Sequence, residues 1–164
     1  MSPRPLSDTN AEAMVYGAVV ATAIAAGLSL DRQLSPGAGA LALVGSSTAL
    51  WVAHVYAVAV QRRHGASRWL SLREVLRIAY DESPQLAACV PSAAMLLAGA
   101  IGLMGHDAAF NAATWIGIAT LFGLGTWFGT QAGQGPRGAL LSGFVDAALG
   151  ALVVAIKILL SHQQ

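Results

Sequence analysis

Two ionisable side chains lie inside long apolar runs of this sequence, where a charge is costly. Asp146 lies about ten residues into the apolar stretch 136–161, and His54 lies about seven residues before the end of the stretch 37–61. A charge at the centre of a bilayer costs about 2.5–3.5 kcal/mol on insertion scales, so residues of this kind are candidates for function. Because histidine titrates near neutral pH and a carboxylate can hold a proton, this pair of residue types suits transfer of a proton or small cation.

The two residues are predicted to lie at a similar depth. By helical rise, both lie roughly 10–15 Å in from the same predicted boundary of the membrane, so we expect that the two side chains can meet. The alternative for Asp146 is structural, as an acceptor for hydroxyl groups in the bundle (Ser46, Ser47, Thr48 or Ser142). For His54 the alternative is an aromatic cluster with Trp51 and Tyr56.

Other arrangements that carry chemistry are not found. No phosphate-binding loop, HExxH zinc motif or CxxC pair occurs, and Cys89 is a lone cysteine in an apolar run. His106 and Asp107 are expected to form a short turn, and no basic patch interleaved with aromatic residues predicts nucleic-acid binding. We therefore predict that the protein is not an enzyme, and that it has no metal site and no cofactor.

Composition places these residues in a membrane protein. Of the 164 residues, 55% are hydrophobic and 10% are charged, whereas soluble domains carry about 25% charged residues. The mean hydropathy is +0.61. A soluble chain of this size could not bury so much apolar surface, which excludes a soluble globular enzyme, a disordered tail and a disulfide scaffold.

The apolar runs predict an all-α bundle with five transmembrane helices and one amphipathic interfacial helix. A helical span needs about 20 mostly apolar residues. One domain of residues 13–161 is expected after a cytoplasmic tail of residues 1–12, with a capping box at Thr9–Glu12 and an N-cap at Ser83 before Pro84. The predicted spans are residues 13–30, 37–61, 84–104, 109–132 and 136–161.

The amphipathic helix is predicted at residues 71–82. Ser71 and Glu74 have the spacing of a capping box. Apolar residues share one face of this helix (Leu72, Val75, Leu76, Ala79 and Tyr80), and Trp69 and Tyr80 are expected to anchor it at the bilayer surface. The alternative is a short helix that packs on the bundle and faces the solvent.

The basic residues predict the orientation. Seven of the nine lie on one predicted side (Arg4, Arg62, Arg63, Arg68, Arg73, Arg77 and Arg137), against Arg32 and Lys157 on the other. By the positive-inside rule, the N-terminus and the 71–82 helix are cytoplasmic and the C-terminus is outside, in the cell inner (plasma) membrane.

Small residues predict how the helices pack. Gly125, Gly129 and Gly133 recur every four residues, and Gly143 lies on a stripe of small residues in the last span. Such spacing allows two helices to approach closely in lipid. Pro91 should kink the third span. Because five thin spans enclose little interior, a homo-oligomer or a membrane protein partner is expected besides the bilayer itself.

Two classes of function remain open. The first is a small transporter or channel-like protein that moves a proton or small cation through Asp146 and His54. The alternative is a non-transporting membrane subunit or scaffold that binds a protein partner or anionic lipid.

The layout resembles that of the vacuolar iron transporter family. The similar features are five spans, Gln61-Arg62-Arg63 after the second span, Pro91-Ser92-Ala93-Ala94 in the third, and an arginine that opens the fifth. The resemblance implies a cation transporter of the same architecture. The first span reads Tyr16-Gly17-Ala18 where that family has an Asn-Asp-Gly-type signature, so no metal-binding residue is carried over.

Overall fold

The computed structural model describes residues 8–66 and 70–161, and its elements are helices and connecting turns. The predicted anchor Trp69, together with Arg4 and Arg68, lies outside this part of the chain, and so do the side chains of residues 8–10 and 157. The helices are α1 (Asp8–Leu28), α2 (Pro36–Ala66), α3 (Leu72–Asp81), α4 (Pro84–Ala87), α5 (Val90–Ala100), α6 (His106–Gln131) and α7 (Pro136–Ser161).

Several of these helices are long and apolar enough to cross a membrane. Within the described residues, four helices qualify, and a bent pair of segments would make a fifth span if it crosses as one. The four are α1, α2, α6 and α7, with mean hydropathies from 1.3 to 2.2. This all-helical architecture is that of a multi-pass membrane protein. Helix α1 begins at Asp8, before the cap predicted at Thr9 and inside the predicted tail.

The third predicted span is broken. Instead of one helix over 84–104, the chain forms the single turn α4 and then α5, and the segments Leu72–Ala87 and Val90–Ala100 meet at 55°. The break lies just before Pro91, whose missing N–H and ring interrupt the helical ladder. Ser83 occupies the N-cap position before Pro84, as predicted, but its backbone is already helical and its side chain makes no capping hydrogen bond.

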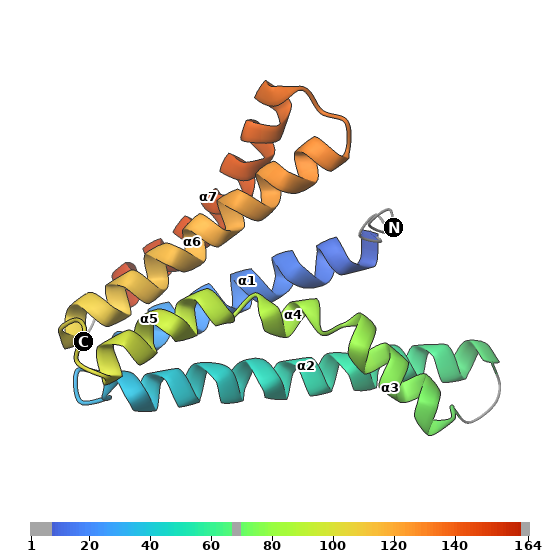
Figure 1. The fold of residues 1–164 in the computed structure, drawn as a ribbon, viewed down its shortest axis with the longest axis horizontal. Helices are drawn as coiled ribbons and strands as arrows, with labels where there is room; N and C mark the ends of the chain where they lie inside the picture. Colours follow the sequence, from blue (N-terminus) through green and yellow to red (C-terminus); the bar gives the residue numbers. More distant parts are fainter. Residues whose placement is uncertain (1–7, 67–69, 162–164) are drawn as a thin grey trace.

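The helices converge at one end and splay apart at the other (Figure 1). The turns before α2 and before α6 lie together at the converging end, and Nε2 of His106 is 2.9 Å from the carbonyl oxygen of Leu34. A tight core fills this half of the bundle, where Leu43, Leu96 and Phe110 are fully or almost fully buried. At the opposite end α6 and α7 diverge from α2 and α3, with the N-terminal half of α1 between them.

Glycines bring α6 and α7 into close contact. A Cβ added to Gly125 would lie 2.9 Å from Cα of Gly143, and one added to Gly129 would lie 2.7 Å from Cα of Ala139. These are positions on the stripes expected from the sequence. Gly133 differs, because α6 ends at Gln131 and Gly133 has φ +73° with no atom near its missing side chain.

Gly133 therefore ends a helix rather than packing one. Its N–H donates to the carbonyl of Thr130, and the N–H of Gln134 donates to the carbonyl of Gly129. This is the hydrogen-bond pattern of a Schellman cap, which needs a left-handed residue and so favours glycine. The four-residue periodicity does not distinguish this role from packing.

Helix α3 carries the predicted capping box at its start. The N–H of Ser71 donates to Oε2 of Glu74 at 2.7 Å, and the hydroxyl of Ser71 accepts from the N–H of Glu74. The helix contacts the bundle through Ile78, which is fully buried. The apolar stripe of Leu72, Leu76 and Tyr80 is 60–79% exposed, so α3 has one anchoring residue and a separate unburied apolar face.

Candidate functional site: acidic cavities beside α1

A histidine and a carboxylate meet where α2 passes the turn between α3 and α4. Nε2 of His54 is 3.3 Å from Oε2 of Glu82. The side chain of Glu82 is only 4% exposed, whereas that of His54 is 41% exposed. The ring of His54 also stacks on Tyr16 of α1, with the ring centroids 6.3 Å apart. The imidazole therefore links a buried carboxylate to open space.

That open space is a cavity of about 620 Å³ between α1, α2 and the turn after α3. Its polar lining comes from three parts of the chain, and both ends of the His54–Glu82 contact take part in it. Glu12 and Tyr16 lie one helical turn apart on α1 and so face the same way. Gln61 and Arg62 add an amide and one positive charge from α2. The cavity thus holds two carboxylates and one arginine.

Asp146 lies at a second open cavity, of about 500 Å³, between α1 and the α6–α7 pair. Its carboxylate lies over Gly125, where an added Cβ would be 2.5 Å from Oδ2. Phe128 of α6 lines the same cavity, as do Glu12 and Tyr16 of α1. Since Glu12 and Tyr16 line both cavities, the two adjoin at the N-terminal half of α1.

The structure thus pairs His54 with a different carboxylate from the one expected. Equal depth in two helices let the sequence place His54 beside Asp146, but α1 packs against both α2 and the α6–α7 pair and brings each residue to its own cavity. In the structural alternative, hydroxyl groups donate to the carboxylate of Asp146, but two of those hydroxyl groups donate to other acceptors. Thr48 donates to the carbonyl of Val44, and Ser142 donates to Oε1 of Gln134.

A row of polar groups continues from His54 into the bundle. Ser47, Trp51 and His54 are spaced at i, i+4 and i+7 on α2, which places them on one face. The buried atoms Oγ of Ser47, Nε1 of Trp51 and Oε1 of Gln85 have no hydrogen-bond partner within the described chain. Buried polar atoms without protein partners commonly bind ordered water.

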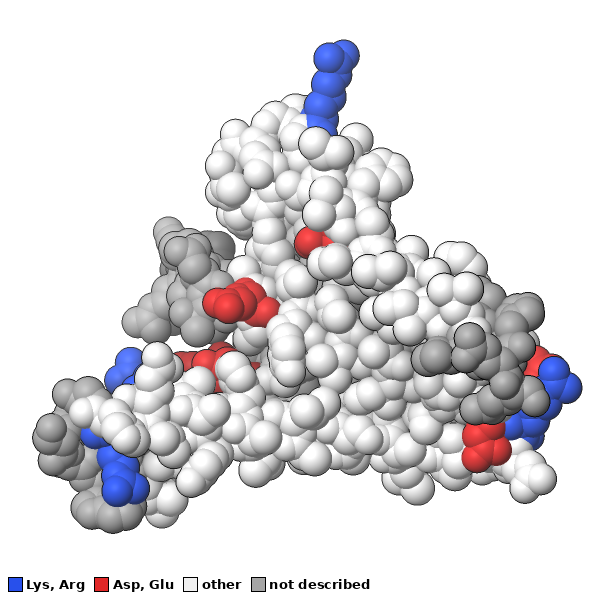
Figure 2. Space-filling view, turned by 180° about the vertical axis from the view of Figure 1, so that it is seen from behind, with Lys and Arg blue, Asp and Glu red and all other residues white. Residues whose placement is uncertain are grey.

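Acidic side chains lie near the middle of the molecule as well as at one end. Figure 2 shows a group of them in the middle of one face, and others beside basic side chains at one extremity. In the described part of the chain, no group of three or more His, Cys, Asp or Glu side chains is placed to hold a metal ion. The loop turn expected at His106 and Asp107 is not found, because both residues belong to the first turn of α6, where Nδ1 of His106 is 3.0 Å from Oδ1 of Asp107.

No protein-family model, curated protein or solved structure matches this chain. The resemblance to the vacuolar iron transporter family therefore stays a prediction.

The sequence reasoning did not identify Glu12, Tyr16, Glu82 or Gln85 as site residues. Glu12 was assigned to a helix cap, and Glu82 was only the last residue of the predicted amphipathic helix. One signal was present: Glu12 and Tyr16 have the i, i+4 spacing of a shared helix face. Nothing in the local sequence marks Glu82, because its burial depends on the turn that folds α4 back against α1 and α2.

Proposed function

We propose that the protein moves a proton or small cation across a membrane through the acidic cavities beside α1. In this arrangement α1, α2, α4–α5, α6 and α7 form five spans, and α3 lies in the interface. The splayed end, which carries most of the arginines, faces the cytoplasm. The length and hydropathy of α1, α2, α6 and α7 support their placement across the membrane.

The contact between His54 and Glu82 is the main support for the proposal. A carboxylate that is 4% exposed inside an apolar bundle is costly unless it has a partner or a role. Its partner is a histidine that also borders the cavity. An imidazole can accept a proton on the cavity side and share it with the carboxylate of Glu82 through this contact.

The further path would run along the face of α2. Ser47 and Trp51 lie on the face of α2 that carries His54, on the side of the converging end, and their buried polar atoms have no hydrogen-bond partner within the described chain. Ordered water between such groups would carry a proton where no titratable side chain is present. Asp146 and Glu12 add negative charge at the adjoining cavity, which attracts cations and repels anions.

Flux into liposomes tests the proposal. Purified protein is reconstituted with a pH-sensitive dye or a cation indicator inside, and flux is measured for wild type, His54→Gln, Glu82→Gln and Asp146→Asn. We expect His54→Gln and Glu82→Gln to lower flux roughly tenfold or more, because each removes a titratable group from the path. Asp146→Asn should lower it as well, by removing charge from the second cavity.

Matched controls come from the same chain. His64→Gln changes an exposed histidine of α2 that bonds to the carbonyl of Val60, and Asp31→Asn changes an exposed loop carboxylate. Both should leave flux unchanged. Absence of flux for protons, alkali cations and divalent metals in wild type would overturn the proposal and favour the non-transporting scaffold. Equal losses of flux in His64→Gln and His54→Gln would mean that the His54–Glu82 contact has no specific role in transport.

A further inference from the structure

Two carboxylates flank a pair of stacked rings in the cavity between α1 and α2. The ring of Tyr16 stacks on that of His54, with the centroids 6.3 Å apart, and Nε2 of His54 is 3.3 Å from Oε2 of Glu82. Glu12 lies one helical turn before Tyr16 on the same face of α1. All four side chains line the same cavity, so the two rings lie between two carboxylates at its border.

The size and the charge of this cavity restrict what it can hold. Its volume of about 620 Å³ is within the range of small-molecule sites and much larger than a bare ion. With a neutral imidazole, Glu12 and Glu82 supply two negative charges and Arg62 supplies one positive charge, which leaves one negative charge in excess. Such a cavity attracts a monovalent cation and repels an anion.

The lining suits an organic cation better than a bare metal ion. Calcium takes about six to eight oxygen ligands, but within residues 8–66 and 70–161 no three His, Cys, Asp or Glu side chains are placed to hold one metal ion. The face of an aromatic ring carries partial negative charge and attracts ammonium groups, which is how proteins recognise quaternary ammonium ligands. Tyr16 is 49% exposed, so its ring is accessible to such a ligand.

The adjoining cavity repeats this combination of acid and ring. Glu12 and Tyr16 line it as well, Asp146 adds a third carboxylate, and Phe128 adds another aromatic side chain. The other residues that line it are apolar. An apolar substituent on an ammonium group therefore finds apolar surface beside Tyr16, in a space that is bordered by carboxylates on both sides of α1.

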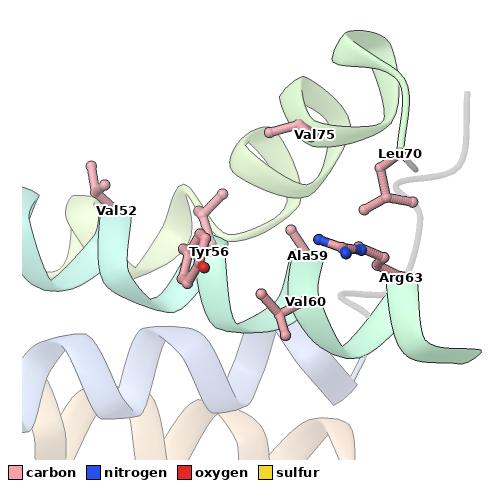
Figure 3. A pocket seen from close by; sticks show the side chains of 8 residues that line it. Val52, Tyr56, Ala59, Val60, Arg63, Leu70 and Val75 are labelled. Atoms are coloured by element: carbon pink, nitrogen blue, oxygen red, sulfur yellow. The ribbon is translucent and has the colours of Figure 1, made fainter. Parts of the chain in front are cut away.

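A separate groove between α2 and α3 lacks this combination. Figure 3 shows Tyr56 there among apolar side chains of α2, with Val75 of α3 across the groove. None of the described residues that line this groove is acidic. Tyr56 is exposed, so it presents a tyrosine ring without a carboxylate and is a matched comparison for Tyr16.

We propose that the cavity between α1 and α2 binds a monovalent organic cation, namely an ammonium group with an aromatic or branched apolar substituent. The ammonium group lies over the ring of Tyr16, between Glu12 and Glu82, and the substituent packs on the apolar surface of α1. This inference deepens the proposed function and rests on it, because it names the class of cation that the transport cavity holds. Its test is binding at equilibrium, so loss of binding and loss of flux are separate outcomes.

Isothermal titration calorimetry of the full-length protein in detergent tests the site. The probe is benzyltrimethylammonium, which cannot lose its charge. The comparison is neopentylbenzene, its uncharged isostere, and both are also titrated into protein-free micelles. We expect the cation to bind roughly tenfold or more tightly than the isostere, because only the cation gains from the rings and the carboxylates. Equal affinity of the two compounds would mean an unspecific apolar pocket and would overturn the proposal.

Two pairs of matched variants locate the site. Tyr16→Leu should weaken binding about fivefold, the usual strength of a cation–π contact at a partly exposed site, and Tyr56→Leu should leave it unchanged. Tyr16→Phe, which keeps the face of the ring, should bind like wild type. Glu12→Gln should also weaken binding about fivefold, the effect of one charge at close range in water. Asp31→Asn, in an exposed loop, should not. Equal losses within either pair would contradict the proposal.

Two further measurements complete the test. Calcium at the concentration of the probe should not displace it, and displacement would mean a metal site, against the proposal. Circular dichroism of each variant must show wild-type helical content. If Tyr16→Leu fails to fold, the comparison of Glu12→Gln with Asp31→Asn and that of the cation with its isostere still decide. Binding without flux would reject the proposed function but support the cation site, and flux without binding would do the reverse.

Discussion

Nε2 of His54 lies 3.3 Å from Oε2 of Glu82, and this contact joins the middle of α2 to the turn between α3 and α4. The two residues are 28 positions apart in the sequence. Their contact lies where α2 passes the broken third span. Because the carboxylate is almost fully buried, the contact serves folding as well as any proton transfer.

A double-mutant cycle measures this contact. We expect His54→Gln and Glu82→Gln to be non-additive in unfolding free energy in detergent, with a coupling of about 1 kcal/mol or more, since the two side chains touch. The cycle of His54→Gln with Asp146→Asn is the control, and it should be additive within about 0.5 kcal/mol. Additivity for His54 with Glu82 and coupling of His54 with Asp146 would instead support the pairing of His54 with Asp146 that helical depth predicts.

The α6–α7 contact should be sensitive to a single methyl group. Gly143→Ala places a Cβ against the hydroxyl of Thr126 and 2.7 Å from the carbonyl oxygen of Phe122. Such overpacking costs about 1–3 kcal/mol. Gly123→Ala is the matched control, because nothing lies within 4 Å of its added Cβ, and alanine is the better helix former there. Thermal unfolding should rank Gly143→Ala below wild type and Gly123→Ala at or above it.

His106 should hold the two turns at the converging end together. Its Nε2 is 2.9 Å from the carbonyl oxygen of Leu34, and its ring packs at 5.0 Å on Phe110. We expect His106→Ala to cost about 1 kcal/mol of stability, the usual net value of one hydrogen bond. Hydrogen exchange should quicken in residues 29–35 but not at the splayed end. Unchanged exchange there, or an equal effect in His64→Ala, would contradict this role.

Most of the secondary structure follows from the sequence because hydropathy and helix signals act locally. A 20-residue apolar run has to form a helix in lipid to satisfy its own backbone, whatever surrounds it. Helices α2, α6 and α7 therefore lie within a few residues of the predicted spans. The capping box at Ser71 is equally local, since both of its hydrogen bonds lie within four residues.

The sequence by itself thus determined the all-helical class, the apolar runs, the start of α3 and the glycine spacing of α6 and α7. Only the tertiary structure decided that α1 packs between α2 and the α6–α7 pair. That packing separates His54 from Asp146, places Glu12 and Tyr16 at both cavities, and buries Glu82. These relationships depend on interhelical packing. The local periodicity of a sequence does not indicate how far apart two residues in different helices lie. Equal depth along two helices restricts which side chains can meet, but the position of a third helix selects which do.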